Sequence, residues 1–128
     1  MTDTVRAFLK RRGCADFVVA GGLPRLVADW EQMVASVCAG EEQDEDEYLN
    51  DMDGRDILAA ALAVAPRRER EAFLARVQAA DARIRACLVP TRECLSGAET
   101  AGKCAYDREQ SWWYFHRPAV LDASWRTF

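Results

Sequence analysis

The spacing of apolar residues predicts that the longest helix of the chain spans residues 66–88. Apolar side chains recur there at intervals of three and four residues: Phe73, Val77, Ala80, Ile84 and Leu88. This spacing places them along one stripe of a helix with 3.6 residues per turn. Pro66 suits a first helical position. The helix ends before Pro90, because the residue that precedes a proline is disfavoured in the helical region.

A second stripe of the same segment lies nearly opposite the first and consists only of alanine. Its members are Ala72, Ala75, Ala79, Ala82 and Ala86. A helix with apolar stripes on two sides is typically covered on both, so we interpret residues 66–88 as the central helix. Because alanine is also the best helix former, an alanine stripe that faces solvent is the alternative.

Two strong patterns precede the acidic middle of the chain. Residues 2–12 are predicted to form a helix that Thr2 or Thr4 can cap at its start and Gly13 can end in the left-handed conformation. Residues 24–39 carry a broad apolar stripe at helical spacing and predict a second helix.

Other segments give weaker signals. Residues 16–22 fit a short helix or a turn, although Val18 and Val19 also favour a strand. The Asp53–Gly54 pair is a turn signal, and residues 57–65 again have helical spacing. We therefore expect a break near Gly54 and a separate helix after it.

The C-terminal third is predicted to be less regular. Residues 89–106 are expected to form an irregular loop, because proline, glycine, serine and threonine recur there. Asp107 and Gln110 have the spacing of a capping box, which would open a short helix over residues 112–116. Residues 119–128 either dock or fray. We expect an all-α, single-domain orthogonal bundle of about five or six helices around helix 66–88.

The charge distribution singles out residues 41–56. This segment holds nine acidic residues and one basic residue, a charge of −8, whereas the whole chain carries −4. It could bind a basic partner, or remain a solvated segment, as most such runs do. Some of its acids could instead pair with arginines of helix 66–88. The candidate partner-binding acids are Glu41, Glu42, Asp44, Glu45 and Asp46.

The sequence WWYFHRP, which begins at Trp112, is a second candidate interaction site. Tryptophan and arginine are typical interface anchors, so Trp112, Trp113 and Arg117 are candidate partner-binding residues. Packing of these aromatic residues in the core is the more ordinary interpretation. Together with the arginine-rich helix, WWYFHR could also bind nucleic acid, since bases stack on aromatic rings.

Catalytic and metal chemistry find little support in the sequence. Cys87, Cys94, Cys104 and His116 could be written as a zinc site, but their spacing matches no common zinc motif. His116 is the only histidine, and no nucleophile, phosphate-binding or dinucleotide-binding motif is present. We therefore expect a protein that is not an enzyme and needs no cofactor, with a metal or enzymatic use of these four residues as the alternative.

No stretch of 18 apolar residues and no signal-like N-terminus is present, so we expect a cytoplasmic protein without a membrane span. Three stretches, YLNDMDGR from Tyr48, DAR from Asp81 and WWYFHRP from Trp112, resemble short bacterial proteins of unknown function. The resemblance implies no activity. The leading hypothesis is an acidic inhibitor, of the immunity type, that neutralises a basic effector protein. The oligomeric state stays open, a homodimer included.

Overall fold

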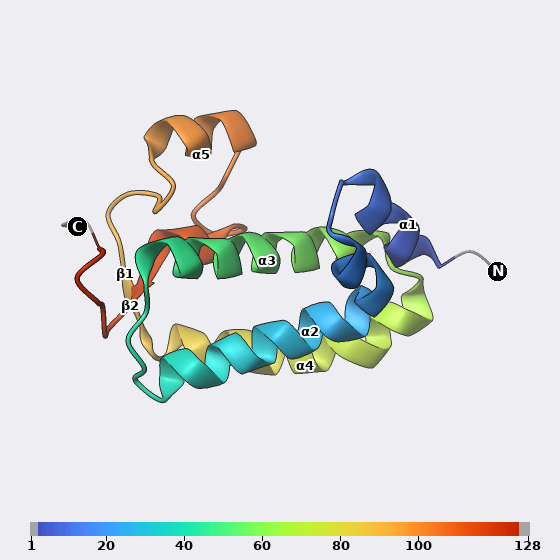
Figure 1. Cartoon of the computed structure of the whole chain (residues 1–128), viewed down its shortest axis with the longest axis horizontal. Coiled ribbons are helices and arrows are strands. Elements are labelled where there is room, and N and C mark those ends of the chain that lie inside the picture. Colours follow the sequence, from blue (N-terminus) through green and yellow to red (C-terminus); the bar gives the residue numbers. More distant parts are fainter. Residues whose placement is uncertain (1–2, 126–128) are drawn as a thin grey trace.

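The computed structural model describes residues 3–125 and is built mainly from helices, as Figure 1 shows. In chain order the elements are α1 (Thr4–Arg11), α2 (Asp16–Cys38), α3 (Glu45–Val64), α4 (Arg67–Arg85), β1 (Leu88–Pro90), α5 (Ala98–Cys104), the 3-10 helix η1 (Trp112–Phe115) and β2 (His116–Pro118). The strands β1 and β2 pair antiparallel, with Leu88 opposite Pro118. The predicted all-α fold is confirmed, with this small sheet added.

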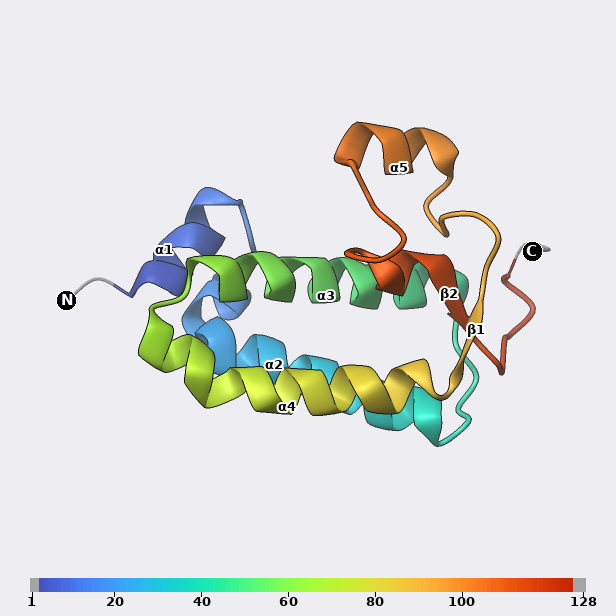
Figure 2. The same ribbon diagram turned by 180° about the vertical axis from the view of Figure 1, so that it is seen from behind.

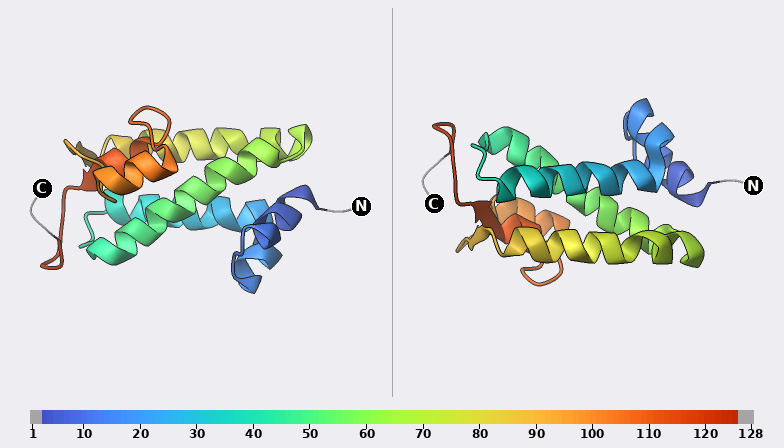
Figure 3. Two further views of the ribbon diagram at one scale, coloured as in Figure 1. Left: turned by 90° about the horizontal axis from the view of Figure 1, so that it is seen from above. Right: turned by 90° about the horizontal axis from the view of Figure 1, so that it is seen from below.

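The three long helices form the body of the molecule. Figures 1 and 2 show α2, α3 and α4 running along its long axis, with α1 at one end and the small sheet at the other. Figure 3 shows α3 crossing the other two helices at an oblique rather than a right angle. Helix α2 packs against α1, α3 and α4, and its contacts with them are the most extensive in the fold. Among residues 3–125, no helix combines the length and apolar character needed to cross a membrane.

Helix α4 is covered along one stripe only. Val77, Ala80 and Ile84 are buried, as their spacing predicts, and Leu88 is buried just beyond the helix. The alanine stripe is exposed throughout: Ala72, Ala75, Ala79, Ala82 and Ala86. The central placement predicted for helix 66–88 is therefore wrong, and the alanines act through their helix propensity rather than through burial.

The N-terminal helices follow the predicted boundaries, with one different cap. Asp3 caps α1, because its carboxylate accepts a hydrogen bond of 3.0 Å from the backbone N–H of Arg6. Thr4 is instead the first helical residue, and Thr2 lies outside the described residues. Residues 16–22 are helical up to Gly22, where a φ of 61° and ψ of −156° bend α2. Glycine tolerates this conformation, which costs other residues free energy.

Helix α3 runs without interruption through Asp53 and Gly54, so the predicted break is wrong. The physical reason is one buried stripe that spans both sides of the glycine. Its members are Tyr48, Met52, Arg55, Leu58 and Leu62. A glycine inside a helix costs about 1 kcal/mol relative to alanine, and burial of these side chains outweighs that cost.

The C-terminal third is more ordered than predicted. Residues 89–106 contain most of β1 and all of α5, so they are not one irregular loop. The tail docks up to its last described residue. The indole Nε1 of Trp125 donates a hydrogen bond of 2.5 Å to the carbonyl of Gln43, and its ring lies 5.5 Å from that of Tyr48. Residues 126–128 of the predicted tail lie outside the described residues.

Candidate binding groove

A buried ion pair connects the three long helices. Asp81 of α4 accepts hydrogen bonds from Arg55 of α3, at 3.0 Å from Nε and 2.8 Å from Nη2. The same carboxylate accepts a hydrogen bond of 2.9 Å from the indole Nε1 of Trp30 on α2. Paired carboxylate and guanidinium groups of this kind fix both distance and orientation. The contact therefore sets how α2, α3 and α4 sit relative to one another.

The guanidinium of Arg55 also lies between two indole rings. Its central carbon is 5.7 Å from the ring centroid of Trp30 and 4.4 Å from that of Trp113. Only 7% of the residue is exposed, and its Nη1 atom has no hydrogen-bond partner within residues 3–125. A buried donor without a partner costs free energy. Arg55 thus keeps an unused donor close to the space between α2 and α3.

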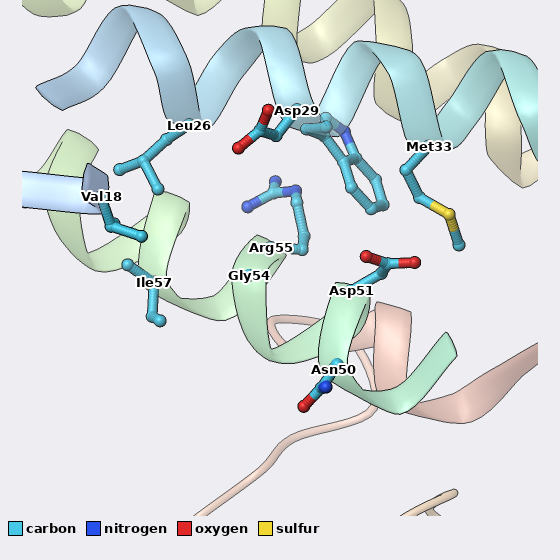
Figure 4. Close-up of a pocket in the computed structure, with 10 residues that line it drawn as sticks. Val18, Leu26, Asp29, Met33, Asn50, Asp51, Gly54, Arg55 and Ile57 are labelled. Atoms are coloured by element: carbon cyan, nitrogen blue, oxygen red, sulfur yellow. The ribbon is translucent and has the colours of Figure 1, made fainter. Parts of the chain in front are cut away.

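That space is a cavity of about 160 Å³ between α2 and α3. Figure 4 shows Arg55 rising from α3 toward α2, with Asp29 and Asp51 nearby. The remaining walls are mostly apolar and include Val18, Leu26, Met33 and Ile57. The cavity therefore combines an apolar lining with two carboxylates and one guanidinium.

The cavity continues into a larger polar hollow of about 480 Å³, since Asp29, Met33 and Asp51 line both. The carboxylates that line the polar hollow are Asp29, Glu41, Glu42, Glu47 and Asp51. Within residues 3–125, no lysine or arginine lines this hollow. We call the cavity and the hollow together the acidic groove.

Two of these carboxylates have partners of their own. Asp29 forms an ion pair with Arg25 at 3.4 Å, with both side chains largely exposed. Glu41 accepts a hydrogen bond from the hydroxyl of Ser36. An exposed ion pair contributes only about 0–1 kcal/mol, so the groove retains a strong negative character.

Asp51 shows the negative electrostatic character of the groove most clearly. Burial is the largest cause, and together with the nearby charges of Glu47 and Asp29 it raises the pKa of the Asp51 carboxyl to about 6. Both causes disfavour the ionised form. A cation bound in the groove would favour the ionised form of Asp51. The groove is therefore suited to bind a positively charged group.

We expect Asp51→Asn to stabilise the protein at neutral pH. The raised pKa means that the folded state holds a proton more tightly than the unfolded state, so ionisation of Asp51 opposes folding increasingly as the pH rises from about 4 to 6, and fully above 6. The gain should be about 1 kcal/mol after allowance for solvent screening. It should be much smaller at pH 4, where the folded state is protonated and the unfolded state is partly so. Urea unfolding at pH 7.5 and pH 4 measures it, and an equal effect at both values would contradict this cause.

The structure separates the five acids predicted from the sequence. Glu41 and Glu42 line the groove. Asp44 caps α3 by accepting a hydrogen bond of 3.0 Å from the backbone N–H of Glu47. Glu45 is buried at 8% exposure, and Asp46 is exposed outside the groove lining. These last three are therefore not part of the groove.

Sequence reasoning missed three groove acids. Glu47 and Asp51 are one helical turn apart on α3, a spacing that places them on the same face. That signal was present but was read as part of a general acidic run. Asp29 belongs to α2, and no local pattern could indicate that its side chain faces α3.

The aromatic cluster is part of the core. Trp112, Trp113, Tyr114 and Phe115 are all buried, the first two at 6% and 3% exposure. Arg117 is half-buried and donates a hydrogen bond of 2.9 Å to the carbonyl of Pro118. The two indoles predicted as partner contacts, and as a stacking surface for bases, are thus inaccessible. The short 3-10 helix is covered on all sides because α3, α4 and the small sheet surround it.

The acids of residues 41–56 do not pair with the arginines of α4 in the predicted way. Asp56 pairs with Arg12 of α1 at 3.4 Å. Arg76 of α4 pairs with Glu31 of α2. The ion pair between α3 and α4 has its charges the other way round from the prediction: α3 supplies the arginine, Arg55, and α4 supplies the carboxylate, Asp81.

The four residues written as a possible zinc site are not brought together. Cys94 is buried, Cys104 is exposed on α5, and Cys87 lies against Cys38. The Nδ1 atom of His116 is 2.8 Å from the carbonyl of Trp112. Within residues 3–125, no group of three or more histidine, cysteine or acidic side chains is arranged to hold a metal ion.

The fold and the groove define a small helical bundle with an acidic groove between two of its helices. The three stretches that carried the sequence resemblance meet beside this groove, at Arg55, Asp81 and Trp113. No family model, curated protein or solved structure matches the chain.

Proposed function

We propose that the protein is a non-enzymatic binding protein whose acidic groove takes a basic segment of a partner protein. The observation that carries this proposal is the groove lining. Five carboxylates line a hollow to which residues 3–125 contribute no lysine or arginine. An acidic surface attracts basic partners and accelerates their encounter.

The groove can accommodate both parts of such a segment. A lysine or arginine side chain would place its charge near Asp51 and Asp29, while its aliphatic stem packs on Met33 and Leu26. A positive charge on an aliphatic stem is what lysine and arginine side chains present, and this supports a basic protein segment as the partner. An inhibitor that neutralises a basic effector protein is the concrete form of the proposal.

The affinity for such a segment should fall as the pH is lowered from 7.5 to 5. Asp51 has a pKa of about 6, so it gains a proton in this interval and loses its attraction for a cation. Isothermal titration calorimetry with an arginine-rich decapeptide measures the change, which we expect to be about fivefold. In Asp51→Asn the pH dependence should be much smaller. A decrease of the same size in that variant would assign it to other groups.

The natural partner tests the proposal directly. Tagged protein is used to capture partners from a lysate of the source organism, in three forms: the unchanged chain, a groove variant, and a control. The groove variant carries Asp29→Asn, Glu47→Gln and Asp51→Asn. The control carries Glu93→Gln, Glu99→Gln and Glu109→Gln, three exposed positions outside the groove. Both variants remove three negative charges.

We expect a basic protein to be captured by the unchanged chain and by the control, and to be lost with the groove variant. The capture should survive treatment of the lysate with nuclease, because the partner contacts the groove and not a nucleic acid. Equal capture of the same protein by the groove variant would contradict the proposal. A partner that disappears with nuclease would point to nucleic acid instead.

A further inference from the structure

Two cysteine thiols lie in direct contact where α2 and α4 both have their C-terminal ends. The Sγ atoms of Cys38 and Cys87 are 2.8 Å apart. Each Sγ atom is also 3.5 Å from the backbone carbonyl oxygen of Arg83. Cys38 is the last residue of α2, and Cys87 follows the end of α4, directly before β1. The contact therefore joins elements that are packed along their length.

Accessibility and contacts distinguish Cys38 and Cys87 from the other cysteines. Both are partly exposed, so a small reagent in solution can reach them. Cys94 is buried, and Cys104 is exposed on α5. No contact of similar closeness joins Cys14, Cys94 or Cys104 to another thiol in the described part of the chain. The geometry thus distinguishes one pair among the five.

We propose that Cys38 and Cys87 are an oxidisable pair that forms an intramolecular disulfide. A disulfide has an S–S length of about 2.05 Å, so the two sulfur atoms need to approach by less than about 1 Å. The fixed contact makes closure of the bond effectively unimolecular. The proposal does not depend on the binding function of the groove.

The oxidant in this reaction is a small disulfide such as oxidised glutathione. One protein thiol loses its proton, attacks the small disulfide and forms a mixed disulfide, which releases one small thiol. The second protein thiol then loses its proton and attacks the protein sulfur of the mixed disulfide, which releases the second small thiol. Two protein S–H groups are oxidised, and one small disulfide is reduced to two thiols.

The surroundings of Cys38 slow its attack. Burial is the largest cause, and together with contact with Cys87 it raises the pKa of the Cys38 thiol to about 11. A thiol with a raised pKa supplies little thiolate at neutral pH. Whichever of the two thiols reacts first, the other resolves the mixed disulfide.

The bond would link residues 49 positions apart in the sequence. A cross-link over such a distance restricts the unfolded chain and stabilises the fold. It would also fix the end of α2 immediately before Glu41 and Glu42, which line the acidic groove. In a reducing compartment the pair stays reduced. A change to oxidising conditions would form the bond and stabilise this end of the molecule.

The test uses the full chain in a buffer of reduced and oxidised glutathione. After equilibration, free thiols are blocked with a maleimide in denaturant, so that the buried Cys94 also reacts. Intact mass and peptide mapping identify the bond. We expect three thiols to react out of five, a mass lower by two hydrogen atoms before blocking, and a linked pair of peptides containing Cys38 and Cys87. The midpoint of thermal unfolding should rise by about 5–10 °C and return on reduction.

Variants test the pairing of the two cysteines. Cys38→Ser should stop at a mixed disulfide between Cys87 and glutathione, because the resolving thiol is absent. Cys104→Ser should form the bond as the unchanged chain does. Circular dichroism confirms that each variant is folded. Five reactive thiols in the oxidised unchanged chain, or a bond that involves another cysteine, would overturn the proposal.

Discussion

Replacing Asp81 with alanine is expected to lower the free energy of unfolding by about 3–5 kcal/mol. The carboxylate is the partner of Arg55, whose side chain is 8% exposed, and it also accepts the Trp30 indole N–H. Without it, a guanidinium stays buried without a counter-charge. Such a group costs far more than a lost surface contact.

A matched control lies on the same helix. Like Asp81, Glu71 pairs with an arginine. Its partner is Arg67, and the side chains of Glu71 and Arg67 are 63% and 89% exposed. Glu71→Ala should therefore change stability by less than about 1 kcal/mol. Urea unfolding followed by circular dichroism measures both variants. If Asp81→Ala costs no more than Glu71→Ala, the buried ion pair does not hold the three helices together.

Removing three groove charges is expected to weaken binding of an arginine-rich decapeptide about 30-fold. The variant combines Asp29→Asn, Glu47→Gln and Asp51→Asn. Each lost charge close to a bound cation removes about 0.7 kcal/mol, which gives about 2 kcal/mol in total. Isothermal titration calorimetry at low salt measures the dissociation constant. The difference should shrink at high salt, because exposed charges are screened.

The control for this prediction removes the same net charge elsewhere. In the variant with Glu93→Gln, Glu99→Gln and Glu109→Gln, affinity should fall by less than about threefold, since only the long-range attraction is reduced. If both triple variants weaken binding equally, the peptide responds to net charge rather than to the groove.

Local patterns were sufficient for most helices of the fold. The apolar spacing of residues 24–39 and the burial of Val77, Ala80 and Ile84 agree with the structure, because one buried stripe per helix is what such spacing encodes. The alanine stripe misled because alanine favours helices whether or not it is buried. At Gly54 a local turn signal was outweighed by side chains that are buried on both sides of it.

Features that depend on distant residues could not be predicted in this way. Arg55 and Asp81 are 26 positions apart, and Trp30 is 51 positions from Asp81. No periodicity links residues across such distances. The four consecutive aromatic residues looked divided between core and surface, but helices and strands from elsewhere in the chain cover every face of η1.

Only one side of the candidate groove could be predicted from the sequence, because local patterns do not show which distant residues come together. The acidic run marks its α3 side, and two of the candidate acids, Glu41 and Glu42, line it. The contribution of α2 was hidden, because Asp29 becomes a groove residue only when α2 and α3 pack together. Charge runs identify a region, whereas the fold selects which of its charges act together.

Backbone amide shifts during titration with the arginine-rich decapeptide would test the central claim most directly. The chain is labelled with nitrogen-15, and the shifts are mapped onto the structure. We expect the largest shifts in the backbone amides of α2 around Asp29 and of α3 between Glu47 and Arg55, and in the side-chain N–H of Trp30, which lines the cavity. Shifts concentrated on α4 or α5, with the groove unchanged, would contradict it.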